Sequence, residues 1–137
     1  MTRSMLRILP ACLLLLGIGA SAGVRTGRAR IVHDPALKSL DLGPADILVV
    51  PFTDVGWIPI LSEVGAIVAE TGGQLSHTSI IAREYGIPCV TGIPGAAELI
   101  RTGDRVTVDG WLGIVTIEAR LPFERKMDYI ESKGVAD

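Results

Sequence analysis

The chain has 137 residues, of which 48% are hydrophobic and 20% charged, and its formal net charge at pH 7 is −2. This length and apolar content suit a single folded domain and exclude a disordered tail. The small negative charge, without long runs of one sign, provides no basic face, so we expect no nucleic-acid partner.

The amino-terminal residues have two interpretations. Arg3 and Arg7 precede an apolar run, and small residues at 20–22 follow it, which is the layout of a secretory signal. The uncharged run 8–24 is short for a membrane span and is interrupted by Pro10, so we do not expect it to cross a membrane. The alternative is a buried strand around residues 13–16, or an ill-chosen start ahead of the domain.

The first half of the chain predicts strands. Residues 27–35 alternate in polarity and predict an edge or half-exposed strand that ends at a proline. The continuous apolar run 47–50 predicts a strand buried on both faces. A short helical segment or turn, broken by Pro59, is expected within 56–65, and residues 65–70 predict a second buried strand.

The second half adds helices between strands. Ser76 is a good N-cap for a helix over 78–85, and Gly86 is placed to end it. Residues 87–92 predict a third short strand, and residues 94–104 predict a short helix that ends at a glycine.

Residues 105–118 predict two further strands around an Asp-Gly turn. The whole pattern is of the α/β class, with right-handed crossovers and a β-rich beginning and end.

A histidine stands where a predicted loop meets a predicted helix. The loop leaves a buried strand, and ligands of open α/β sheets bind at that end of the strands. Unpaired N–H groups at a helix start favour an anion, and two glycines let the loop curl its own N–H groups toward the same point. We therefore predict a cradle for a phosphoryl group. Its members are Thr71, Gly72, Gly73 and Ser76.

His77 lies inside this predicted cradle. Neutral imidazole is a nucleophile at physiological pH, and the helix start would stabilise an anionic phosphorylated product. His77 is therefore the candidate catalytic residue, as a covalent phosphoryl carrier. The alternative is a helix-capping histidine beside an ordinary turn. If Gly73 takes a positive φ, or if its N–H closely faces the phosphoryl group, a Gly73→Val substitution must distort the cradle.

The remaining reactive side chains have simpler interpretations. His33 precedes Asp34-Pro35 and is expected in a surface turn. Cys12 and Cys89 are far apart and have no metal-ligand spacing with either histidine, so we expect two free buried thiols and no metal site.

Several linked motifs resemble one family. "DILVVPFTD", "ETGGQLSH", "IAREYGIPCVTG" and "GDRVTVDGWLGIV" occur in the order and spacing of the mobile phosphohistidine domain of phosphoenolpyruvate-utilising enzymes. The likeness covers roughly residues 17–118. It implies a swivelling β/β/α domain over 17–119, with three layers and a mostly parallel central sheet. Residues 1–16 then form a preceding apolar segment and 120–137 a polar tail.

The resemblance also implies a function. His77 matches the family histidine that takes a phosphoryl group at one catalytic domain and delivers it at another, whereas Arg83 and Glu84 are expected to be surface charges of the helix. Ser79 stands where alanine is common. Nothing in the chain resembles a nucleotide-grasp or phosphoenolpyruvate-binding domain, so we expect no cofactor bound by the chain itself. ATP or phosphoenolpyruvate, with Mg, would bind on separate partner subunits.

Two alternatives accompany this hypothesis. The chain could instead be a non-catalytic remnant or binding module that keeps the fold without turnover. The donors place the expected carrier in the cytoplasm, and export or membrane tethering through residues 1–22 is the alternative location.

Overall fold

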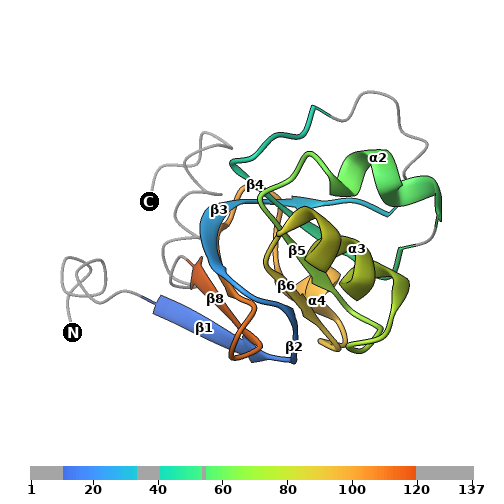
Figure 1. The fold of residues 1–137 in the computed structure, drawn as a ribbon. Helices are drawn as coiled ribbons and strands as arrows, with labels where there is room; N and C mark the ends of the chain where they lie inside the picture. The colour runs from blue at the N-terminus through green and yellow to red at the C-terminus, as the bar shows by residue number, and fades with distance from the viewer. Residues whose placement is uncertain (1–10, 34–40, 54, 120–137) are drawn as a thin grey trace, which may run out of the picture.

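One mixed sheet forms the centre of the protein. The computed structural model describes residues 11–33, 41–53 and 55–119, so the predicted polar tail lies outside it. Eight described strands share the sheet in the order β1-β8-β7-β3-β4-β5-β6-β2, with the helices packed around it (Figure 1). The strands are β1 (Ala11–Leu16), β2 (Ile18–Ser21), β3 (Val24–Ile31), β4 (Asp46–Val50), β5 (Ala66–Ala69), β6 (Cys89–Thr91), β7 (Arg105–Asp109) and β8 (Ile114–Ala119).

Only the centre of this sheet is parallel. β3, β4, β5 and β6 run parallel to one another, whereas β1, β8, β7 and β2 pair antiparallel to their neighbours. The fold is therefore mixed α/β with a partly parallel sheet, and the predicted mostly parallel arrangement holds only for the strands at its centre. Short turns such as the one between β7 and β8 can join only antiparallel strands, because a parallel return needs a long crossover.

The two buried strands were predictable from their composition. Every residue of β4 and of β5 is buried, as the continuous apolar runs indicated. The strand predicted at 27–35 is different. β3 pairs with β7 on one side and with β4 on the other, so it is not an edge strand, but most of its residues are exposed or half-buried, as the half-exposed alternative predicted. Its partner β7 is distant in sequence, and local polarity patterns carry no signal for such a partner.

The helices are short, apart from one. They are η1 (Val55–Trp57), α2 (Ile58–Leu61), α3 (His77–Tyr85) and α4 (Ala96–Leu99). Pro59 lies in the first turn of α2 and does not break it, since a first-turn residue needs no N–H donor. The helix predicted up to Gly103 already ends at Leu99, where Ile100 turns extended and is buried at 1% exposure.

Two apolar cores lie on opposite faces of β4, β5 and β6. The first joins one face of these strands to Trp57, Leu61 and Ala82 of the helices. The second joins the other face to Ala96 of α4 and to apolar residues of β7 and β8. β7 contacts β5 and β6, although β3 and β4 stand between them in the sheet order. The sheet is therefore folded over, and its β7–β8 half covers the face opposite α2 and α3.

The amino-terminal apolar run forms strands of this sheet. β1 is an edge strand paired with β8, and its Leu13, Leu14 and Leu16 are exposed, which differs from the expected buried strand. β2 is the opposite edge and pairs with β6. Within the described ranges, no helix has the length and apolar character needed to cross a bilayer.

The turn between β7 and β8 packs tightly on the β2–β6 pair. Gly110 donates its N–H to the Gly23 carbonyl at 2.8 Å. A Cβ atom at Gly110 would lie 1.7 Å from the Ser21 carbonyl oxygen and 3.1 Å from the Cys89 nitrogen. Both obstacles are backbone atoms of paired strands, so they cannot move aside cheaply.

We expect Gly110→Ala to destabilise the protein by about 2–3 kcal/mol or more, because either the β7–β8 turn or the β2–β6 pair must shift. Urea unfolding followed by circular dichroism measures this change. Gly43→Ala is the matched control, since a Cβ there meets no atom within 4 Å, and it should change stability by less than about 0.5 kcal/mol. Similar losses in both variants would contradict the close approach at Gly110.

Candidate active site

The predicted cradle joins the carboxyl end of β5 to the start of α3. Its first residues are held by neighbouring strand ends. Glu70 and Thr71 donate their N–H groups to Val50 and Pro51 at 3.0 and 3.1 Å, and the Thr71 hydroxyl also donates to Pro51 at 3.1 Å. The Glu70 carboxylate accepts the Gly95 N–H at 3.2 Å. The base of the loop is thus fixed to two other loops, and the Thr71 hydroxyl serves that attachment.

The two glycines of the loop have different roles. Gly72 takes a φ of +121°, and a Cβ there would lie 3.0 Å from the Ser76 hydroxyl oxygen. Gly73 has no positive φ, and a Cβ there would meet nothing within 4 Å. The first of the two conditions stated for Gly73, a positive φ, is therefore not met. Gly72 is the residue at which a side chain is excluded.

Hydroxyl groups fasten the loop to the start of α3. Ser76 is the N-cap, as predicted, and its hydroxyl oxygen accepts the Ser79 N–H at 3.3 Å. The Gly73 carbonyl accepts from the Ser76 and Ser79 hydroxyls at 2.9 and 2.5 Å. Ser79, the departure from the more common alanine, is therefore part of the structure that shapes the loop. In the same first turn of α3, the hydroxyls of Thr53 and Thr78 lie 2.5 Å apart.

His77 is the first residue of α3 and is partly buried. Its Nδ1 atom is buried without a hydrogen-bond partner. Of the described side chains, only the hydroxyl of Thr91 shares this condition, and Thr91 adjoins the same loop, with its Cβ 3.8 Å from the position of a Gly72 Cβ. An unpaired buried polar atom costs roughly 1–3 kcal/mol of stability. Two such atoms at one loop therefore indicate a functional site rather than a purely structural one.

Arg83 is an exposed charge on α3, as expected, and it also binds the loop and a neighbouring strand. Its guanidinium donates to the Gln74 carbonyl at 2.6 Å and to the Ala20 carbonyl of β2 at 2.8 Å. Gln74 donates from its side chain to the neighbouring Gly19 carbonyl at 3.4 Å. Arg83 therefore connects the loop to an edge strand. The sequence shows that an arginine stands at this position, but it does not show the partners of the guanidinium. Those partners are backbone carbonyls, which no residue pattern identifies.

Cys89 pairs with Ser21, the residue after Ala20 whose carbonyl Arg83 binds. It is fully buried and free, as predicted, whereas the side chain of Cys12 lies outside the described residues. Burial raises the pKa of the Cys89 thiol to about 12, against a smaller lowering by Arg83. Such a thiol stays protonated and unreactive, so it adds no second nucleophile. No group of three or more His, Cys, Asp or Glu in the described ranges could hold a metal ion.

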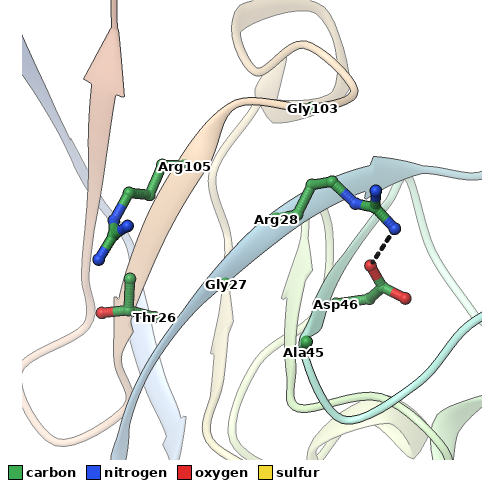
Figure 2. A pocket seen from close by; sticks show the side chains of 7 residues that line it. All are labelled: Thr26, Gly27, Arg28, Ala45, Asp46, Gly103 and Arg105. Carbon is green, nitrogen blue, oxygen red and sulfur yellow. Dashed lines mark hydrogen bonds and ion pairs between the residues drawn. The ribbon is translucent and has the colours of Figure 1, made fainter.

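A separate cleft of about 660 Å³ lies at the other end of the parallel strands (Figure 2). Arg28 approaches Asp46 there at 3.3 Å, and Arg105 pairs with Glu118 at the same distance. Asp46 is buried and also accepts the Gly43 N–H at 2.9 Å, so it shapes the turn before β4. The charges of this cleft are thus matched within the protein, and His77 is not part of its lining. The lining residues are Thr26, Gly27, Arg28, Ala45, Asp46, Gly103 and Arg105.

A family profile matches the part of the chain that builds this site. The profile is described as "PEP-utilising enzyme, mobile domain" and covers residues 42–113, which include the loop, α3 and the β7–β8 turn. The chain belongs to this family. The resemblance inferred from the sequence motifs is thereby confirmed.

The relatives of this mobile domain are much longer proteins. It is 44% identical to an uncharacterized phosphotransferase, YvkC, of Bacillus subtilis over 77% of the chain, and 42% identical to the rifampicin phosphotransferase of the same organism over 75%. It is 41% identical to the phosphoenolpyruvate synthase of Pyrococcus furiosus over 74% of the chain. The matches span only 13%, 12% and 12% of those relatives, respectively.

Solved structures agree with the fold. A solution structure of Enzyme I superimposes on the mobile domain with a TM-score of 0.51 and 29% identity, over 72% of this chain and 38% of that one. Aconitase X from Thermococcus kodakaraensis reaches a TM-score of 0.58 at 20% identity, over 77% of this chain and 98% of that one, which shows a shared fold alone.

The contrast between the two glycines can be tested directly. Gly72→Ala should destabilise the protein by about 1–3 kcal/mol, because alanine is strained at this φ and its Cβ crowds the N-cap. Gly73→Ala should change stability by less than about 1 kcal/mol, in either direction. Urea unfolding of both variants measures the difference, and amide exchange at Ser76 and Ser79 reports on the cap. Equal effects would contradict the assignment of the excluded side chain to Gly72.

Proposed function

We propose that this chain is a phosphoryl carrier in which His77 is transiently phosphorylated. The observation that carries the proposal is the placement of an imidazole at the start of α3. The loop beside it is held by α3 and its cap, because the Gly73 and Gln74 carbonyls accept hydrogen bonds from Ser76, Ser79 and Arg83. Since Nδ1 is buried, Nε2 is the nitrogen proposed to react. Its lone pair would form the N–P bond while the P–O bond to the donor's leaving group breaks and that oxygen keeps the bonding electrons.

The same position suits the product. The N–H groups at the start of α3 and the helix dipole favour the added negative charge. The loop is fastened by Ser76, Ser79 and Arg83, so this environment exists before the phosphoryl group arrives. A remnant that only preserved the fold would have no need of a nucleophile in this place, which favours the carrier over the binding module.

The donor and acceptor sites are proposed to lie on partner domains or subunits. The relatives carry most of their length outside the segment that this chain matches, and they are named as phosphotransferases and a phosphoenolpyruvate synthase. We therefore assign ATP or phosphoenolpyruvate, with Mg, to nucleotide-binding and acceptor-binding partners. These donors place the proposed activity in the cytoplasm.

The proposed movement is a swivel of the whole β/β/α domain between such partners. The two cores on opposite faces of β4–β6 support a three-layer arrangement, with helices on one side and the β7–β8 half of the sheet on the other. A domain with cores of this kind can move as one rigid body and keep His77 and its loop in register.

Replacing His77 with alanine should abolish phosphorylation. The test uses a Bacillus subtilis rifampicin phosphotransferase in which the matching segment is exchanged for residues 17–119 of this chain. With ATP or phosphoenolpyruvate supplied in turn, we expect an acid-labile, alkali-stable phosphate on His77, located by mass spectrometry under alkaline conditions. His77→Ala should lower labelling at least about 100-fold. Equal labelling of the folded variant, or no label from either donor, would count against the carrier.

Leu75 offers a test of partner contact. It is 87% exposed, two residues before His77, which leaves a large apolar side chain open beside the proposed nucleophile. If a partner covers it during transfer, Leu75→Asp should slow donor-driven labelling of the same chimera about tenfold or more, since burying a leucine contributes about 1.5–3 kcal/mol. Leu99→Asp on α4, also exposed, is the control and should leave labelling unchanged. Equal effects would mean that Leu75 meets no partner.

A further inference from the structure

Arg83 holds the loop beside His77 from a distance. It lies in the last turn of α3, and long side chains on a helix lean toward the helix start, so its guanidinium returns to the loop. One terminal nitrogen donates to the Gln74 carbonyl at 2.6 Å and the other to the Ala20 carbonyl at 2.8 Å. A planar guanidinium with two such bonds fixes the relative position of both carbonyls.

The Ala20 carbonyl is available because β2 contains an irregularity. In the pairing with β6, Gly19 lies opposite Val90 and Ser21 opposite Cys89, so Ala20 is an extra residue in the ladder. A bulged residue is left without its ladder partner. Arg83 takes up this carbonyl and so anchors the loop to a strand that is itself held in the sheet.

Two successive loop carbonyls are consequently fixed. The Gly73 carbonyl is bonded to the Ser76 and Ser79 hydroxyls, and the Gln74 carbonyl is bonded to Arg83. In a trans peptide the C=O and the following N–H point in opposite directions. The N–H groups of Gln74 and Leu75 are therefore directed away from these bonds, and no described group accepts from them.

We propose that Arg83 is a positioning residue for phosphoryl transfer to His77. It does not touch the reacting atoms. By holding the Gln74 carbonyl beside β2, it fixes the loop that precedes His77, including the peptide that carries the unpaired Leu75 N–H. This inference rests on the proposed carrier function and adds to it a specific requirement for a guanidinium at the far end of α3.

The test uses phosphoramidate, which phosphorylates imidazole without a partner protein. The new N–P bond forms as the N–P bond of the donor breaks, and ammonia leaves with the proton released by the imidazole. His33 is exposed and serves as the internal standard in the same chain. The measured quantity is the ratio of the labelling rates at His77 and His33, obtained by mass spectrometry under alkaline conditions.

We expect Arg83→Met to lower this ratio about tenfold, because the variant keeps the apolar stem and loses both donated bonds. Arg83→Lys should recover part of the ratio, since one ammonium replaces the charge but not the fork. Arg101→Met is the matched control, an exposed arginine outside the site, and should leave the ratio unchanged. In ¹⁵N spectra, phosphorylation of the wild type should shift the Gln74 and Leu75 amides, and the shift should shrink in Arg83→Met.

A ratio within twofold of the wild type in folded Arg83→Met would overturn the proposal. If Arg83→Met fails to fold, Arg83→Lys decides in the same way. Circular dichroism and urea unfolding separate a positioning effect from loss of structure. If Arg83 had only a structural role, its replacement would lower stability and leave the labelling ratio unchanged. Phosphoramidate needs no donor domain, so an absence of donor-driven label in the chimera would remove the carrier function without deciding the role of Arg83.

Discussion

The antiparallel pairing of β2 with β6 determines where the histidine loop is held. Through this pairing, residues close to the amino terminus reach the end of the sheet at which α3 begins. They supply the carbonyls of Gly19 and Ala20 to Gln74 and Arg83. The β7–β8 turn closes over the same pair at Gly110, where no side chain can be accommodated. The site is thus built on contacts between the beginning, middle and end of the chain.

Local signals in the sequence were sufficient for the elements that carry the site. The apolar run of β4 and the cap residues Ser76 and Gly86 act through their immediate neighbours, and the structure places the strand and the helix α3 as those signals indicate. The same holds for His77 at the start of the helix. Such features depend on backbone propensities and on burial, both of which a short window of sequence records.

Features that depend on distant partners could not be read in this way. The interior place of β3 requires β7, and the length of α4 is limited by the burial of Ile100 in a core shared with β7 and β8. The difference between Gly72 and Gly73 is one of φ, and two adjacent glycines look alike in sequence. The two bonds of Arg83 could not be predicted, because its partners are carbonyl oxygens, which every residue possesses.

The bulge at Ala20 has a consequence for how such a chain can change during evolution. Since the strand supplies main-chain oxygens, exchanging the side chain at this position for another small residue leaves the anchor of Arg83 in place. An insertion or deletion in β2 is different, because a shift of one residue turns the strand over and moves the bulge to another residue. We therefore expect related chains to differ in the amino-acid composition of β2 far more often than in its length.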